Sequence, residues 1–183
     1  MCCILSGTGV QINTNMNKYF CSIPWVHLRL DSSYQGETGV SPCCKFYYEE
    51  WDRLNPDNHV RNGINSAVNT LPFRGIRQNM LDGKPTVGCV NCYQDELLHG
   101  TSMRTISNSS YPIDPRELTT DYLHTKFIEV SLDNTCNLEC KMCSSFNSTK
   151  LRTRDELLGY YVHPNSVCDP DLLDELDLDS VEY

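Results

Sequence analysis

Three closely spaced cysteines directly after a clear strand pattern constrain this chain more than any other feature of its sequence. The segment 126–132 alternates apolar and polar residues, which predicts a β-strand. It runs into Cys136, Cys140 and Cys143, which are separated by three and then two residues. A helix is expected from about Ser148 to Tyr161. The pattern therefore predicts a strand–loop–helix unit with three thiols on its loop.

Three thiolates on one short loop suit an iron–sulfur cluster better than a single metal ion. Iron–sulfur centres prefer soft sulfur ligands, and three ligands for four irons leave one iron open. Zinc normally takes four ligands in tetrahedral array. Neither His124 nor His163 stands at a usual zinc-finger spacing from the loop. A zinc knuckle or unrelated free thiols are the alternatives.

The strand 127–131 and the loop 135–143 closely resemble the first strand and cluster loop of radical S-adenosylmethionine enzymes. The match includes the Cys-Asn-Leu opening of the loop and the apolar residue before its last cysteine. The resemblance implies that Met142 lies near the adenine of S-adenosylmethionine. It also implies reductive cleavage of S-adenosylmethionine and hydrogen abstraction from a substrate, chemistry that the cofactors supply. The implied ligands of a [4Fe–4S] cluster are Cys136, Cys140 and Cys143.

Enzymes of this family build a partial TIM-type barrel. The resemblance predicts an α/β fold in which residues 120–183 form only the first strand, cluster loop and helix of that barrel. The family's second strand typically carries a Gly-Gly-Glu-Pro-like segment that holds the amino group of S-adenosylmethionine. The sequence has no such segment, and residues 177–183 look like the approach to that strand. We therefore expect a truncated chain that is inactive alone, with a radical enzyme as its full-length parent.

A second group of cysteines precedes this unit. One thiol from each strand of a predicted hairpin and two from a C-x2-C turn could form a four-thiolate site. The set resembles the auxiliary-cluster modules called SPASM and twitch domains. In these modules a return strand with the pattern Val-x-Pro-Cys precedes a later C-x2-C. The resemblance implies a second [4Fe–4S] cluster in an α+β, twitch-like domain over residues 16–110. The expected ligands are Cys21, Cys43, Cys89 and Cys92.

Other interpretations of this second group stay open. A four-cysteine zinc ribbon fits the spacing almost as well, and buried free cysteines are common. Cys43 fits the return motif better than Cys44 does. Glu96 either orients the cluster turn or lies on a solvated helix face. The cysteines interpreted as incidental are Cys2, Cys3 and Cys168.

Local patterns outline the rest of the chain. Residues 1–15 are expected to be a disordered leader, and His27 is interpreted as a packed or surface histidine. The expected elements are a strand over 20–30, a return strand over 40–46, helices over 70–81 and 93–106, and a linker over 108–115.

Composition excludes some functions. The net charge of −9 argues against a nucleic-acid-binding surface. No stretch approaches the roughly 20 apolar residues of a membrane span, and the amino terminus makes a poor secretory signal. Eleven cysteines without a signal peptide suggest metal binding in a reducing cytoplasm.

We expect a cytoplasmic radical enzyme with an unknown substrate. By family analogy a peptide is the leading candidate, and a flavodoxin or ferredoxin is the reductant. The alternative is a non-catalytic zinc or iron–sulfur module.

Overall fold

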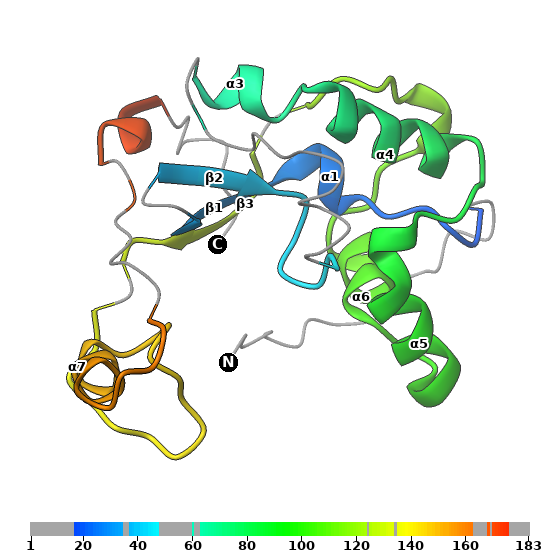
Figure 1. Ribbon diagram of the computed structural model, residues 1–183. Coiled ribbons are helices and arrows are strands. Elements are labelled where there is room, and N and C mark those ends of the chain that lie inside the picture. Colours follow the sequence, from blue (N-terminus) through cyan, green and yellow to red (C-terminus); the bar gives the residue numbers. More distant parts are fainter. Residues whose placement is uncertain are drawn as a thin grey trace.

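A three-stranded mixed sheet lies at the centre of the computed structural model (Figure 1). The central strand β1 (His27–Tyr34) pairs antiparallel with β2 (Glu37–Ser41) and parallel with β3 (Phe127–Ser131). The fold is thus mixed α/β. The structure describes residues 17–34, 37–47, 60, 63–123, 125–133, 135–162, 168 and 170–175.

The pleat of the sheet separates an apolar face from a polar one. Leu28 and Leu30 of β1 are buried in the core, against which Ile128 and Val130 of β3 also pack. On the opposite face Arg29 has Ser41 of β2 and Glu129 of β3 as its cross-strand neighbours. The sheet therefore carries a row of polar side chains on the face turned away from the hydrophobic core.

The strand expected over 20–30 is wrong in its first half. Ile23–Val26 form a helical turn, α1, and β1 begins only at His27. Pro24 in the first turn has a backbone φ angle suited to a helix start. All four α1 side chains are buried, so buried and exposed side chains do not alternate here as they would along a half-buried strand. The return strand expected over 40–46 is present as β2, shifted toward the amino terminus. β2 ends before Pro42, which has no N–H for a ladder hydrogen bond.

Helices cover the core-facing side of the sheet. The helix expected over 70–81 is confirmed as α4 (Leu71–Leu81), which lies near α3 (Ile64–Ala67) in Figure 1. Helical spacing brings Phe73, Ile76 and Met80 of α4 into the core. Within the described part of the chain, no helix has the length and apolar character needed to cross a membrane.

The single helix expected over 93–106 is wrong, because two helices occupy this region. α5 (Val90–His99) ends at Gly100, which has a left-handed φ of 72°. α6 (Met103–Ser110) then starts at Ser102, which forms a capping box with Thr105. The linker expected over 108–115 consequently begins inside α6. Within the described residues, short 3₁₀ helices lie at Val87–Cys89, Pro115–Glu117 and Pro170–Glu175.

The expected strand–loop–helix unit is present. β3 leads into a loop, and α7 (Thr149–Leu157) follows after Ser148 as its N-cap. α7 ends earlier than expected, two residues before Gly159 with its positive φ. The twitch-like domain and the partial barrel stay predictions. The expected leader 1–15 and the segment 177–183 lie outside the described residues.

Candidate metal centres

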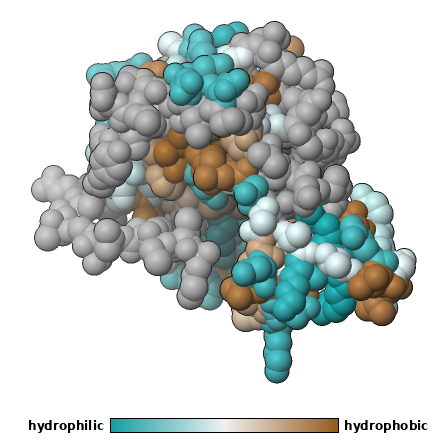
Figure 2. All heavy atoms as spheres, turned by 90° about the vertical axis from the view of Figure 1, so that its left-hand side faces the viewer, coloured by the Kyte–Doolittle hydropathy of each residue, from teal (hydrophilic) through white to brown (hydrophobic). Residues whose placement is uncertain are grey.

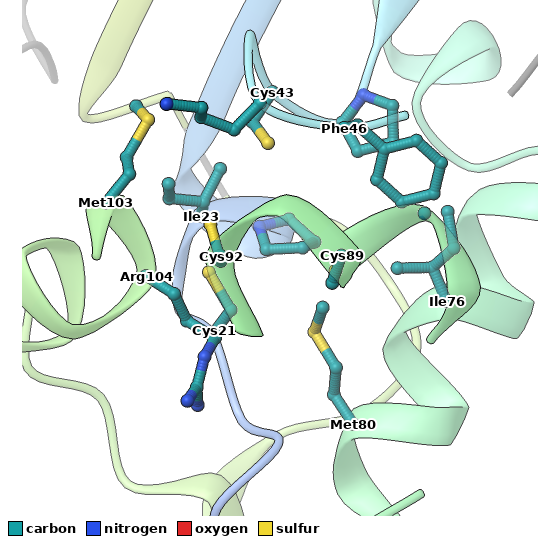
Figure 3. Close-up of a pocket in the computed structure, with 14 residues that line it drawn as sticks. Cys21, Ile23, Cys43, Phe46, Ile76, Met80, Cys89, Cys92, Met103 and Arg104 are labelled. Atoms are coloured by element: carbon teal, nitrogen blue, oxygen red, sulfur yellow. The ribbon is translucent and has the colours of Figure 1, made fainter. Parts of the chain in front are cut away.

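Four cysteines from the first part of the chain line one cavity (Figure 3). Cys21 precedes α1, Cys43 follows β2, and Cys89 and Cys92 flank the start of α5. The thiols expected from the spacing thus meet around one space. Cys44 does not line the cavity, although its Sγ lies 3.5 Å from the Sδ of Met103, which does.

The cavity is small and has partly flexible walls. Its volume of about 20 Å³ leaves room for roughly one water molecule. A four-iron cluster is larger, so the lining must move if one binds. Met80 and Met103 contribute to the lining, and unbranched methionine side chains adapt readily to a new shape.

Hydrogen bonds from α6 fix the backbone on both sides of Cys21. Arg104 and Asn108 donate to the carbonyl oxygen of Phe20 at 2.8 and 3.0 Å. The Asn108 side-chain oxygen also accepts from the N–H of Ser22 at 2.8 Å. Two side chains of a helix more than eighty residues away therefore hold the Cys21 backbone beside the cavity.

The turns that carry Cys43 and the C-x2-C pair are bound to each other. The N–H of Tyr47 donates to the carbonyl oxygen of Gly88 at 2.8 Å, and the Asn91 amide donates to that of Lys45 at 2.8 Å. Gly88 packs so closely on Phe46 that a Cβ there would stand 1.9 Å from the ring. Glycine is thus required where the two turns meet.

Burial dominates the acidity of these thiols. Burial raises the pKa of Cys21 and Cys43 well above the ordinary value, with neighbouring thiols adding to the effect. Burial also raises the pKa of Cys89 to about 12, with Cys92 as the next cause. The thiols that raise the pKa of Cys21 further are Cys89, Cys43 and Cys92, so the four groups lie within electrostatic range of one another. Metal binding would have to displace protons from all of them.

A buried arginine beside the cavity was missed by the sequence-based prediction. Arg104 lines the cavity and forms a bidentate ion pair with Glu96 of α5. Ser102 donates to the same carboxylate at 2.6 Å. Glu96 therefore joins α5 to α6 behind the C-x2-C turn, rather than lying on a solvated face. The i to i+8 spacing across a helix break gives no local signal for this pair.

The second group of thiols lies on the loop after β3. Cys136 is half-buried, whereas Cys140 and Cys143 are exposed. A turn hydrogen bond of 3.0 Å joins the N–H of Cys143 to the carbonyl oxygen of Cys140. Met142 between them is fully exposed. These side chains are accessible for binding a ligand.

Ser148 closes this loop against α7. Its buried hydroxyl lies 2.6 Å from the carbonyl oxygen of Leu138 and 3.2 Å from that of Cys136, and it also accepts from the N–H of Leu151. The Thr149 hydroxyl accepts from the N–H of Cys136 at 3.3 Å. The start of α7 thus fixes the backbone of the first loop cysteine.

The loop and α7 form a lobe that projects from the rest of the molecule (Figure 2). Large hydrophobic residues are exposed on it, and brown atoms mark hydrophobic surface in that view. These residues include Leu138, Met142, Leu157 and Leu158.

The two groups of cysteines lie at opposite ends of the β1–β3 pair. Cys43 follows β2, which runs antiparallel to β1, so it lies near the start of β1. The loop thiols follow β3, which runs parallel to β1, and therefore lie beyond its far end. Figure 1 accordingly shows α7 and α5 on opposite sides of the molecule.

Within the described ranges, no three Cys, His, Asp or Glu side chains converge closely enough to hold one metal ion. Soft thiolates suit iron–sulfur clusters, and a cluster is wider than a single ion, so its ligands stand farther apart. The donor chemistry of both groups fits such clusters. Cys168 is buried in the hydrophobic core, and Cys2 and Cys3 lie outside the described residues.

Comparisons with known proteins give no relative. No family model, curated protein or solved structure matches the chain.

Proposed function

We propose that this protein is a radical S-adenosylmethionine iron–sulfur protein with one [4Fe–4S] cluster on the 136–143 loop and a second in the four-thiol cavity. The strand–loop–helix geometry around three accessible thiols carries the proposal. When bound with S-adenosylmethionine, the loop cluster would supply the electron for reductive cleavage. Hydrogen abstraction from a peptide, and a flavodoxin or ferredoxin as electron donor, rest on resemblance to the family.

The protein's own residues have distinct roles in this proposal. Ser148 and Thr149 hold the loop backbone in place at Cys136 and Leu138. The exposed Met142 side chain provides an apolar contact beside them. In the cavity, hydrophobic walls exclude water, and the buried Arg104 places a cation near thiolates that would be negatively charged.

A non-catalytic zinc module is the second candidate. The four cavity cysteines support it, because Cys₄ is a common structural zinc site.

Anaerobic reconstitution with iron, sulfide and zinc counts per chain tests the proposal. It is combined with electron paramagnetic resonance of the reduced protein, with and without S-adenosylmethionine. We expect iron for two four-iron clusters and a signal that changes when S-adenosylmethionine is added. Zinc in place of iron, or a signal indifferent to S-adenosylmethionine, would overturn the radical-enzyme assignment.

Paired variants separate the two centres. Cys140→Ser should abolish the response to S-adenosylmethionine and leave the cavity iron, whereas Cys92→Ser should do the reverse. Cys44→Ser serves as the matched control, since Cys44 does not line the cavity. Loss of the cavity iron in Cys44→Ser, with retention in Cys43→Ser, would contradict the choice of Cys43 as ligand.

A further inference from the structure

Two of the loop thiols are more accessible than any other thiol in the described part of the chain. Cys140 and Cys143 are exposed, whereas the remaining described cysteines are buried or half-buried. Lys141 and Met142, the residues between them, are exposed as well, so small molecules can approach the turn from solvent. Accessible thiols are the ones that react with such molecules.

The backbone holds these two cysteines close together. The N–H of Cys143 donates to the carbonyl oxygen of Cys140 at 3.0 Å, which closes a four-residue turn. The first and last Cα atoms of a β-turn lie within about 7 Å of each other. Disulfide-bonded cysteines have Cα atoms about 4.4–6.8 Å apart, and thiol–disulfide oxidoreductases use the same C-x2-C spacing. A disulfide between Cys140 and Cys143 therefore requires little movement of the backbone.

Cys136, the third thiol of the loop, is held differently. It is half-buried. Its N–H donates to the Thr149 hydroxyl at 3.3 Å, and its carbonyl oxygen accepts from the Ser148 hydroxyl at 3.2 Å. Its backbone is thus bound on both sides to the start of α7, whereas the turn 140–143 is closed by its own hydrogen bond. The geometry favours a disulfide within the turn over one that includes Cys136.

We infer that Cys140 and Cys143 form a thiol–disulfide exchange site that reacts with a low-molecular-weight disulfide. One cysteine thiolate attacks a sulfur of the small disulfide, which forms a mixed disulfide and releases one small thiolate. The second cysteine thiolate attacks the cysteine sulfur of the mixed disulfide, which forms the Cys140–Cys143 bond and releases the second small thiolate. The cysteines lose two electrons, the small disulfide gains them, and the two cysteine protons end on the two small thiols.

The disulfide and the proposed loop cluster need the same two sulfur atoms. With Cys140 and Cys143 bonded to each other, Cys136 alone would be left as a ligand on the loop, and one thiolate cannot replace three. The exchange reaction would therefore switch cluster binding by the loop off and on. This regulatory consequence rests on the proposed function, whereas formation of the disulfide does not.

Peptide mapping of the full chain, prepared without iron, tests the disulfide. Trypsin cleaves after Lys141, so Cys140 lies in peptide 127–141 and Cys143 in peptide 142–150. The chain is equilibrated with mixtures of reduced glutathione and glutathione disulfide, free thiols are alkylated, and linked peptides are measured by mass spectrometry. We expect these two peptides to be linked increasingly as glutathione disulfide rises and to separate with excess reduced glutathione. Absence of the linked pair, or mixed disulfides with glutathione alone, would overturn the inference.

Two variants identify the bonded cysteines, because Cys136 shares its tryptic peptide with Cys140. Cys136→Ser should keep the linked pair at the same glutathione ratio, and Cys140→Ser should lose it. Dispersion of the amide NMR spectrum verifies that each variant is folded. Loss of the pair in folded Cys136→Ser, or its retention in Cys140→Ser, would make Cys136 the partner of Cys143 and overturn the assignment.

A second measurement separates this inference from the proposed function. The chain is reconstituted with iron and sulfide, freed of excess reagents and treated anaerobically with glutathione disulfide. A loop cluster should slow formation of the linked peptides by at least about tenfold, because ligated thiolates are not free to attack. Equal rates in a chain whose paramagnetic signal responds to S-adenosylmethionine would overturn the switch. A chain with no such signal would overturn the proposed function and the switch with it, while a disulfide mapped in the iron-free chain would stand.

Discussion

The Oγ atom of Ser148 lies 2.6 Å from the carbonyl oxygen of Leu138, so the helix after the cysteine loop is joined to the loop itself. The same hydroxyl caps α7 through the N–H of Leu151. One buried side chain thus both starts the helix and sets the path of the backbone between two proposed ligands. The cysteine loop and α7 are therefore expected to form and to lose structure together.

Removing this hydroxyl should loosen the loop. Ser148→Ala loses the helix cap and leaves the Leu138 carbonyl without its partner, so we expect the free energy of unfolding to fall by about 1–3 kcal/mol. Amide exchange at Cys143 should also become faster. Urea titration and hydrogen exchange measure the two effects. Ser144→Ala, at an exposed position of the loop, is the control, and similar losses in both variants would contradict the role of Ser148.

Adding one methyl group at Gly88 should damage the cavity. A Cβ there would stand 1.9 Å from the Phe46 ring, and overpacking of this kind costs about 1–3 kcal/mol. We expect Gly88→Ala to lower the midpoint of urea unfolding and to reduce the iron bound in the cavity, with the loop cluster retained.

Gly75 offers the matched control for this substitution. It lies inside α4, and a Cβ there would meet nothing within 4 Å. Gly75→Ala should therefore stabilise the protein by about 0.5–1 kcal/mol, since alanine favours the helix. Equal tolerance of alanine at both positions would show that the contact between Gly88 and Phe46 is not needed.

Arg77 is expected to be the most sensitive charged residue of the core. Its fully buried guanidinium donates to the carbonyl oxygens of Pro24, Val68 and Thr120 at 2.8, 2.7 and 2.9 Å. Burial lowers its pKa to about 10, so it stays charged at neutral pH. Arg77→Lys cannot reproduce this fork and should cost about 2–4 kcal/mol of unfolding free energy.

A neighbouring arginine provides the comparison. Arg74 forms its ion pair with Asp121 on the surface, with both side chains about half exposed. Such pairs contribute little to stability, so Arg74→Lys should change the free energy of unfolding by less than about 0.5 kcal/mol. A tolerated Arg77→Lys would mean that the three carbonyl groups find other donors.

Stability should fall between about pH 6.5 and pH 4 because of His27. Burial lowers its folded-state pKa from 6.5 to about 4, and the Arg29 charge adds to this. In that window the unfolded chain binds a proton that the folded chain does not. The contribution of His27 to the free energy of unfolding is therefore fully present above pH 6.5 and is lost as the pH falls. The loss at pH 4 is on the order of 3 kcal/mol.

Other charged groups lie near His27, and Glu129 faces its ring directly. The measured quantity is therefore the difference between the wild-type chain and His27→Gln in unfolding free energy across this pH range. We expect the wild type to lose more stability on acidification than the variant. Parallel curves for the two proteins would contradict the burial of a neutral His27.

The local sequence pattern determined those helices and strands in which apolar residues recur at a regular spacing. The strand 127–131 and the helix α4 follow directly from alternation and from helical spacing, because the forces involved act between near neighbours in sequence. The order of cysteines also indicated which thiols to group. The sequence alone did not reveal that Ile23–Val26 form a helical turn, since a fully buried segment has no polar face to set a period.

Tertiary structure decided the rest. The parallel pairing of β1 with β3, about a hundred residues apart, brings Glu129 to His27. The same kind of long-range contact joins Arg77 to three carbonyl groups and places Arg104 beside the cavity thiols. No local periodicity encodes such contacts, because they depend on which surfaces the whole chain buries together.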